Sequence, residues 1–231
     1  MIVIGNGLIA RAFKSASYHN SKVLIYSSGV SNSNEINPLN FSRESELVKK
    51  YLAMKKYFVY FSTCSINDPD KVNSAYVRHK MLMESLIMTN SSYLIIRLPQ
   101  VVGLGGNKNT LVNKLYDDIK NGRNFNVCVD ARRNLIDIND VLRITLEIIP
   151  LLFGSSRVLN IASPYSIPVI EIVEILEKIA GMPANYNLLS QGGSYSIDIS
   201  DVSRLVKNFD EFFPAEYTNK ILTKYYSVTK S

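Results

Sequence analysis

Four short apolar runs alternate with segments of helical periodicity in the first hundred residues, and this alternation limits the possible folds more than any other feature. Each run is almost continuously apolar, which is typical of strands buried on both faces of a parallel sheet. The runs are MIVIG (1–5), KVLIY (22–26), YFVYFSTCSI (57–66) and YLIIRLP (93–99). The alternation predicts an α/β fold, a Rossmann-type doubly wound parallel sheet whose two faces carry helices.

One intervening segment, SRESELVKKYLAM (42–54), predicts a helix with Ser42 or Ser45 as a possible N-cap. The regular alternation of strand and helix patterns ends near Val101. A polar, glycine-rich loop at 103–110 follows, and further helical and strand patterns come after it. We therefore expect a second portion of the chain with a different role from the sheet.

The charge of the 231-residue chain is moderate, with a formal net value of +6 and with lysines and arginines scattered among the acids. Because no dense basic block is present, nucleic-acid binding is not indicated, while the mild basic excess suits a phosphate-bearing ligand. No apolar run approaches the roughly 20 residues that span a bilayer. The opening IVIG lacks a preceding basic segment, so it predicts a strand rather than a signal peptide, and we expect no membrane association.

The two cysteines, Cys64 and Cys128, have neither metal-ligand spacing nor the density of a secreted scaffold. They predict free thiols in a reducing compartment, and therefore a cytoplasmic protein. Cys64 has no convincing base nearby in the sequence, so we expect it to pack rather than to act as a nucleophile. His19 and His79 lack partners at metal spacing, so no metal site is predicted.

The turn after the first apolar run reads Gly5-Asn6-Gly7-Leu8-Ile9-Ala10, which matches GxGxxA between a strand and a helix. Glycines at these positions let a pyrophosphate approach backbone N–H groups at the start of the helix. The pattern therefore indicates a dinucleotide site, although a purely steric strand-to-helix turn would look the same.

An acid that grips the adenosine ribose is expected about 20 residues further on. The corresponding stretch, YSSGVSN (26–32), contains none before Glu35. One interpretation is a preference for NADP, with Ser27 or Ser28 near the 2′-phosphate, and another is that this strand is not the usual second one. The sequence leaves NAD and NADP unresolved.

Tyr76 and Lys80 are four residues apart in a predicted helix, so they share one face with Cβ atoms about 6 Å apart. An ammonium that close would favour the tyrosinate and prepare the side chain for proton transfer. Coincidence in an amphipathic helix is the alternative. Thr63, at the end of the preceding strand, supplies a hydroxyl where a third catalytic partner is needed.

Arg132 and Arg133 precede another predicted helix and could bind a diphosphate bidentately, or they could be an ordinary surface pair.

Together these segments resemble the extended short-chain dehydrogenase/reductases, the NAD-dependent epimerase/dehydratase family that acts on nucleotide sugars. The resemblance extends over nearly the whole chain, in the family's order of motifs. The matching motifs are the GxGxxA turn, FSTCSI (61–66), YVRHK (76–80), LIIRLPQVVG (94–103) and RRNLIDINDV (132–141).

By position, the resemblance implies that Thr63 hydrogen-bonds the reacting oxygen, that Tyr76 is the acid/base, and that Lys80 binds the nicotinamide ribose and lowers the pKa of Tyr76. The cofactor contacts it implies are Gly5, Gly7, Leu8, Ile9, Ser28, Gly29, Tyr76, Lys80 and Leu98. The substrate contacts it implies are Gln100, Asn107, Asn109 and Arg133, the last of which would hold the substrate diphosphate.

The chain also departs from the family, whose members usually exceed 300 residues and carry GxxGxxG, with Ile4 and Ala10 here at the outer glycine positions. The strand near 22–26 is more similar to a later family strand than to the second one, so the usual second and third strands would be deleted. We expect residues 1–100, joined by about 133–162, to form the dinucleotide-binding core. The smaller C-terminal substrate-binding portion would comprise 101–132 and 163–231.

The resemblance implies NAD(P)-dependent reduction of a 4-keto nucleotide sugar, with a nucleotide-sugar 4-epimerase that retains NAD as the close alternative. Dehydration is disfavoured because Cys64 and Ser65, rather than acids, follow Thr63. A non-catalytic dinucleotide sensor is the alternative from another class. The resemblance also implies a homodimer through the Tyr76 helix, which Met81, Met83 and Leu86 could serve.

Overall fold

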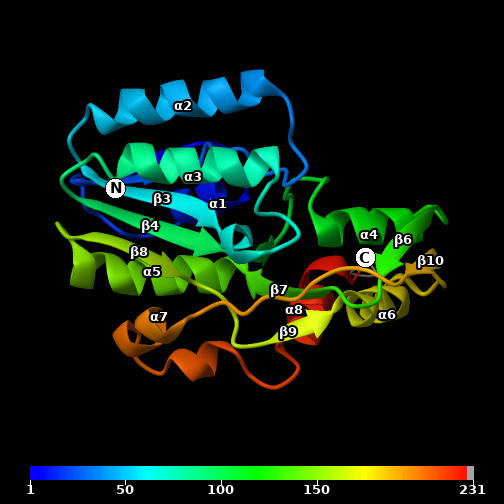
Figure 1. The fold of residues 1–231 in the computed structure, drawn as a ribbon. Coiled ribbons are helices and arrows are strands. Elements are labelled where there is room, and N and C mark those ends of the chain that lie inside the picture. Colours follow the sequence, from blue (N-terminus) through cyan, green and yellow to red (C-terminus); the bar gives the residue numbers. More distant parts are fainter. Residues whose placement is uncertain (228–231) are drawn as a thin grey trace.

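A five-stranded parallel sheet forms the larger part of the computed structural model, which describes residues 1–227 (Figure 1). Every pair of neighbouring strands runs in parallel. The strands lie in the order β1 (Ile2–Ile4), β2 (Val23–Tyr26), β3 (Tyr57–Thr63), β4 (Tyr93–Leu98) and β8 (Ser156–Asn160). The predicted α/β fold with a Rossmann-type parallel sheet is confirmed.

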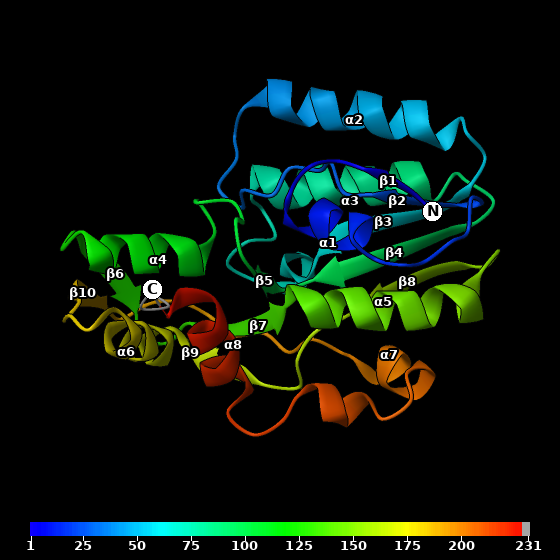
Figure 2. The same cartoon turned by 180° about the vertical axis from the view of Figure 1, so that it is seen from behind.

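Helices cover both faces of this sheet (Figure 2). On one face lie α1 (Leu8–Lys14) and α5 (Ile138–Leu152), and on the other lie α2 (Pro38–Leu52) and α3 (Ala75–Ile87). Successive residues of a strand point to opposite faces, so Ile25 packs in the core under α1 and α5, while Leu24 packs in the core under α2 and α3.

The second helix begins earlier than its sequence pattern predicts. Asn37 is the N-cap of α2, its side chain accepts a hydrogen bond from the backbone N–H of Leu39 at 3.0 Å, and Pro38 occupies the first helical position. Proline is well suited there, because its fixed φ matches the helix and no N–H partner is required. Ser42 and Ser45 therefore lie inside the helix, and the prediction that either one caps it was wrong.

Strand β1 lies at the edge of the sheet, whereas the first strand of a Rossmann sheet usually has the second and third strands beyond it. Among residues 1–227 no strand lies beyond β1, as the deletion hypothesis expects. The first four strands also follow one another across the sheet in chain order. Helix α1, however, lies on the opposite face of the sheet from α2 and α3. The β1–α1–β2 crossover therefore has the opposite hand to the next two, a rare arrangement for parallel strands.

A smaller group of elements lies beside the C-terminal ends of the main strands (Figure 1). It contains the three-stranded sheet of β5 (Gln100–Val102), β7 (Arg132–Asp137) and β9 (Ser166–Pro168), and the parallel pair β6 (Asn124–Cys128) and β10 (Asn185–Leu189). Its helices are α4 (Leu111–Lys120), α6 (Val169–Ala180) and α8 (Tyr217–Tyr226).

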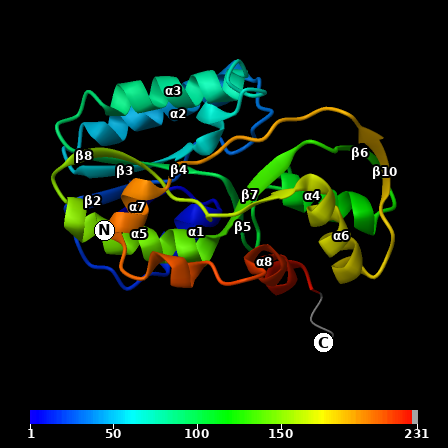
Figure 3. The same cartoon turned by 60° about the horizontal axis from the view of Figure 1, so that its bottom comes forward.

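After β10 the chain returns from this group to the main sheet (Figure 3). The returning segment, residues 190–199, leads into α7 (Ser200–Leu205) and the short 3₁₀ helix η2 (Phe209–Phe212). A second 3₁₀ helix, η1 (Cys64–Asn67), follows β3 directly. The returning segment is fastened at its end by the Asn160 side chain, which donates to the carbonyl of Asp198 at 2.7 Å.

No helix among residues 1–227 is long and apolar enough to cross a membrane. In the same part of the chain, no group of three or more His, Cys, Asp or Glu side chains is placed to hold a metal ion.

The outer face of α3 exposes fewer of the expected interface residues than the sequence suggests. Met83 is buried in the core under α2 and α3, and Leu86 is half-buried against the same core. Met83 is therefore unavailable to a partner, because it points toward the sheet. Met81 and Leu82 are the exposed apolar residues of this helix.

Candidate functional site

A cleft of about 710 Å³ lies between the C-terminal ends of the main strands and the smaller group of elements. Its size is within the usual range of ligand pockets. Almost every residue that the sequence singled out for the site lines this cleft: Gly7, Leu8, Ile9, Ser28, Gly29, Thr63, Tyr76, Lys80, Leu98, Gln100, Asn107, Asn109 and Arg133. The structure therefore brings together residues separated by more than a hundred positions.

Gly5 and Arg132 are the exceptions, and Gly5 shapes the turn instead of lining the cleft. Its φ of +119° is a conformation that L side chains rarely adopt. A Cβ at this position would also lie 2.4 Å from the carbonyl oxygen of Ser27. At Gly7, by contrast, an added Cβ would meet nothing within 4 Å. The first glycine is thus required by the fold, and the second keeps the cleft open.

Thr63 is the last residue of β3, and its side chain is directed by the start of η1. Its Oγ1 accepts a hydrogen bond from the backbone N–H of Ser65 at 3.1 Å. Since that bond uses only a lone pair, the hydroxyl proton of Thr63 remains available to donate. Thr63 interacts with Tyr76, which enters the cleft from α3.

Tyr76 is almost completely buried, at 9% exposure. Burial raises the pKa of Tyr76 above its ordinary value, although the Lys80 ammonium and the hydrogen bond with Thr63 lower it. Lys80 lowers the pKa of Tyr76, as the sequence predicts, but the increase in pKa caused by desolvation is larger. In this structure the phenol is therefore the favoured form of Tyr76 at neutral pH.

Lys80 lies in the same cleft, with 3% exposure. Its Nζ donates to Glu44 Oε1 at 3.1 Å and to the hydroxyl of Tyr60 at 2.9 Å. Neither of these partners was predicted from the sequence. The lysine is therefore held by a buried acid from α2 as well as by its own helix.

Charge and unpaired hydroxyls make the cleft suitable for a phosphate-bearing dinucleotide. The buried hydroxyls of Ser27 and Ser62 line the cleft, and within residues 1–227 neither has a hydrogen-bond partner. Buried polar atoms of this kind call for a partner that the chain itself does not supply. Besides Lys80, the cationic residues at the cleft are Arg43, Lys71, Lys114 and Arg133, against the single acid Asp68. These residues fit NAD or NADP.

The far side of the cleft is formed by loops of the smaller group. Asn107 donates from Nδ2 to Ser31 Oγ at 2.9 Å, which joins the glycine-rich loop to the loop after β2. Arg133 is half-buried and donates to the carbonyl of Gly193 at 3.3 Å. Arg132 is exposed, donates to the carbonyl of Ser166 and does not line the cleft. The two adjacent arginines are thus separated into one that faces the site and one that does not.

Several residues that line the cleft were not predicted from the sequence, notably Arg43 of α2 and Tyr195 of the returning segment. Burial raises the pKa of Tyr195 to about 12. No local pattern identifies Tyr195, because it reaches the cleft only through the path of the chain after β10. Burial also raises the pKa of the Cys64 thiol to about 12, which agrees with a packing role for that residue.

No protein-family model and no curated protein sequence matches this chain. Solved structures do match its fold. A UDP-galactose 4-epimerase superimposes with a TM-score of 0.70 at 13% identity, covering 89% of this chain and 76% of that chain. A UDP-glucuronic acid 4-epimerase from Bacillus cereus, in complex with NAD, gives 0.69 at 20% identity, with 89% and 71% covered.

A third structure, RMD from Pseudomonas aeruginosa complexed with NADPH, gives a TM-score of 0.64 at 16% identity, and the match covers 94% of this chain and 98% of that chain. At such identities the likeness shows the fold alone. The chain thus shares the Rossmann-type fold of these structures, which is the fold class that its sequence predicts.

Proposed function

We propose that the chain is an NAD(P)-dependent enzyme that reduces the 4-keto group of a nucleotide-activated sugar. The observation that carries this proposal is the buried phenol of Tyr76, which lies in the cleft with Thr63 and Lys80. The solved structures support the choice of ligands, because their names include UDP-sugar epimerases and their cofactors include NAD and NADPH.

The cofactor would lie along the turn after β1 and the ends of β2 and β4. When bound, the reduced nicotinamide supplies the hydride that the carbonyl carbon requires. The residues proposed to hold the cofactor are Gly7, Leu8, Ile9, Ser28, Gly29, Tyr76, Lys80 and Leu98, with Gly5 shaping the turn. Ser27 also lies on this wall, and its buried hydroxyl has no hydrogen-bond partner among residues 1–227.

Tyr76 would give its proton to the carbonyl oxygen as that oxygen gains negative charge. A raised pKa supports this direction of transfer, because the residue starts as a phenol. The hydroxyl proton of Thr63 would hold the same oxygen, and Lys80 would orient the cofactor ribose and assist the return of a proton to Tyr76.

The nucleotide diphosphate of the substrate would bind at the far side of the cleft. Arg133 is suited to this role because a guanidinium binds phosphate bidentately. Gln100, Asn107 and Asn109 would contact the sugar or the nucleotide, since all three line the cleft. We propose that the chain divides into a dinucleotide-binding core, residues 1–100 with about 133–162, and a smaller substrate-binding portion.

A nucleotide-sugar 4-epimerase that retains NAD is the second candidate, and the names of the similar structures favour it. The same three residues would serve, but Tyr76 would first have to accept a proton. A dinucleotide sensor without turnover is a third outcome, which the edge position of β1 favours because, within residues 1–227, no strand lies beyond it.

The deciding experiment measures NAD(P)H oxidation across a panel of 4-keto nucleotide sugars, together with mass spectrometry of any dinucleotide that copurifies. Turnover that is lost in Tyr76→Phe supports the reductase. A tightly retained NAD, with interconversion of sugar epimers and no net oxidation, would establish the epimerase instead. Dinucleotide binding without either reaction would establish the sensor.

A homodimer through α2 and α3 also belongs to the proposal. Leu39 at 75% exposure and Leu82 at 64% are the most exposed apolar residues of these helices. We further propose a cytoplasmic location, for which the free state of Cys64 and Cys128 is the supporting observation. A sedimentation experiment that gives a monomer at micromolar concentration would contradict the dimer.

A further inference from the structure

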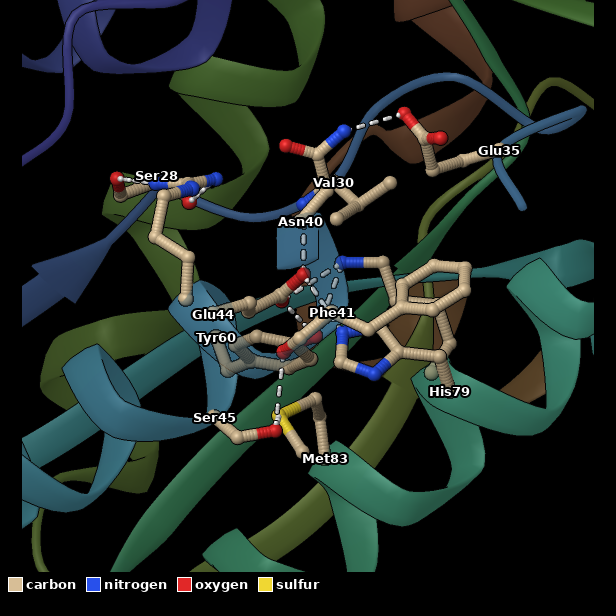
Figure 4. A network of polar contacts seen from close by, with 12 residues as sticks. Ser28, Val30, Glu35, Asn40, Phe41, Glu44, Ser45, Tyr60, His79 and Met83 are labelled. Carbon is tan, nitrogen blue, oxygen red and sulfur yellow. Dashed lines mark hydrogen bonds and ion pairs between the residues drawn. The ribbon is translucent and has the colours of Figure 1, made fainter. Parts of the chain in front are cut away.

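A fully buried carboxylate lies beside the lysine of the proposed site. Glu44, in α2, has no exposed surface and accepts four hydrogen bonds (Figure 4). The donors are the backbone N–H of Val30 at 2.6 Å, the hydroxyl of Tyr60 at 2.6 Å, Nε2 of His79 at 3.0 Å and Nζ of Lys80 at 3.1 Å. These donors come from the loop after β2, from β3 and from α3, so a single side chain joins three parts of the cleft wall.

The ammonium of Lys80 has three protons, and each one has an acceptor within the protein. Lys80 Nζ donates to Glu44 Oε1 at 3.1 Å and to the hydroxyl of Tyr60 at 2.9 Å. Its third and longest contact is to the carbonyl of Phe61 at 3.5 Å. The third contact is at the limit of a hydrogen bond. This N–H group is therefore the one most easily redirected to donate a hydrogen bond to a ribose hydroxyl. Glu44 and Tyr60 therefore fix the position of Lys80 Nζ.

An ammonium as buried as that of Lys80 requires a counter-ion, because desolvation of an unpaired charge is costly. Among residues 1–227, Glu44 is the one carboxylate that forms an ion pair with Lys80. The other titratable or charged groups around this pair are Tyr26 of β2, Arg43 of α2, Tyr60 of β3, Cys64 of η1, and Tyr76 and His79 of α3.

The loop that would contact the cofactor rests on the same pair. A Cβ added to Gly29 would lie 2.7 Å from Glu44 Oε1 and 2.8 Å from Lys80 Nζ, so a larger residue there would displace the ion pair. The next residue, Val30, donates its backbone N–H to the other oxygen of Glu44. The position of the loop and the position of the lysine are thus set by one carboxylate.

We propose that Glu44 is a positioning residue: it holds Lys80 as a fixed ammonium ion near Tyr76 and fastens residues 28–30 to the same centre. The catalytic consequence rests on the proposed function, whereas the ion pair can be tested without turnover.

The first test follows the charge of Lys80 directly, by NMR of protein with ¹³C and ¹⁵N at the ends of its lysine side chains. The Lys80 signal is identified by its loss in Lys80→Met. In Glu44→Gln we expect Lys80 to lose its proton at a pH about one unit or more lower than in the unchanged protein. Glu46→Gln is the matched control, because Glu46 lies in the same helix with an exposed side chain. Equal titration of Lys80 in Glu44→Gln and in the unchanged protein would overturn the proposal.

The second test is kinetic. Glu44→Gln should lower kcat about tenfold or more at neutral pH, and its pH profile should gain an ionisation at the pH where Lys80 titrates in the NMR experiment. A lower kcat with an unchanged pH profile would mean a merely structural role and would overturn the proposal. If the unchanged protein has no turnover, the proposed function fails together with the catalytic part of this inference, while the NMR result still decides on the ion pair.

A third comparison applies if Glu44→Gln does not fold. Lys80→Met leaves a carboxylate buried without its cation, and the double variant Glu44→Gln/Lys80→Met removes both charges. We expect the double variant to unfold at a higher urea concentration than Lys80→Met, because breaking a buried pair is worse than removing it. A double variant that is equally or less stable would overturn the ion-pair assignment.

Discussion

Gly5 and Ser27 lie so close together that a single added carbon on Gly5 would fall 2.4 Å from the carbonyl oxygen of Ser27. The contact joins the end of β1 to the end of β2, where the backbone N–H of Ser27 also donates to the carbonyl of Ile4 at 2.9 Å. The turn that begins the proposed cofactor site therefore packs directly against the neighbouring strand and is hydrogen-bonded to it.

Gly5→Ala should consequently lower the free energy of unfolding by about 2 to 4 kcal/mol, because the variant combines a strained φ with a clash against backbone. The measurement is a urea titration. Gly122→Ala is the control, since Gly122 also has a positive φ of +61° but an added Cβ there meets nothing within 4 Å. We expect a loss of about 1 kcal/mol for the control, and equal losses for the two variants would contradict the clash.

Tyr76→Phe should reduce turnover by about 10² to 10⁴-fold, because it removes the proton donor while retaining the ring that packs in the site. Binding of the dinucleotide, followed by fluorescence or calorimetry, should weaken far less than turnover falls, because the ring and the other cofactor contacts remain. Tyr93→Phe is the matched control, because Tyr93 begins β4 at the opposite end of that strand from Leu98 and the cleft. Full activity of Tyr76→Phe in an assay that works for the unchanged protein would exclude the assigned role.

The parts of the candidate site that could be predicted consist of residues that lie close together in the sequence and whose side-chain types suit the proposed roles. Gly5 and Gly7 follow an apolar run, and Tyr76 and Lys80 share a helix face, so spacing makes each pair a candidate and the order of the other motifs favours it. Thr63 follows from its position at the end of a buried strand. These features depend on periodicities that a folded chain preserves.

Glu44 and the strand order could not be predicted in the same way. A glutamate among the polar residues of SRESELVKK reads as part of a solvated helix face, and only the packing of α2 on α3 and β3 shows that its side chain is buried. Similarly, the edge position of β1 depends on long-range pairing, which a gap between motifs suggests but does not establish.

The stability of the protein should fall in acid because of Glu44. Burial alone would raise the pKa of Glu44, but Lys80 and hydrogen bonds from His79, Tyr60 and Val30 lower it far more, so the net pKa lies well below its ordinary value. A group with a depressed folded pKa stabilises the protein above its unfolded pKa, and this stabilisation is lost as the pH falls toward the folded value. The loss should therefore begin near pH 4.5, the ordinary value of this carboxyl.

In that acid range the free energy of unfolding should fall by up to about 1.4 kcal/mol per pH unit through this one group. Urea titrations at several pH values between about 6 and 3 measure the slope. Glu44→Gln should be less stable at neutral pH but should have a shallower slope below pH 4.5, the ordinary carboxyl value. The Glu46→Gln control should retain the steeper slope, and an equally steep slope in Glu44→Gln would contradict the assignment.

Arg133→Ala should raise the KM for a nucleotide sugar about 10- to 100-fold, because a hydrogen bond between charged groups typically contributes about 1.5 to 3 kcal/mol. The effect on kcat should be smaller, since the diphosphate is remote from the reacting carbonyl. Arg132→Ala is the control that the chain itself provides, because the side chain of Arg132 is exposed and lies outside the cleft. Similar increases in KM for both variants would indicate a general effect of positive charge rather than a specific contact.

Arg43 offers a way to distinguish NADP from NAD. Its guanidinium donates to the carbonyl of Ser28 at 3.1 Å and lines the cleft beside the loop after β2, one of the segments proposed to contact the cofactor. If the cofactor is NADP, Arg43→Ala should weaken binding of NADPH about tenfold or more and leave NADH binding nearly unchanged, because only NADPH carries the 2′-phosphate that an arginine would bind. Calorimetric titration of both cofactors measures the difference, with Lys49→Ala as a control from the exposed face of the same helix. Equal weakening of both cofactors would place Arg43 at the shared pyrophosphate instead, and no effect on either would remove it from the cofactor site.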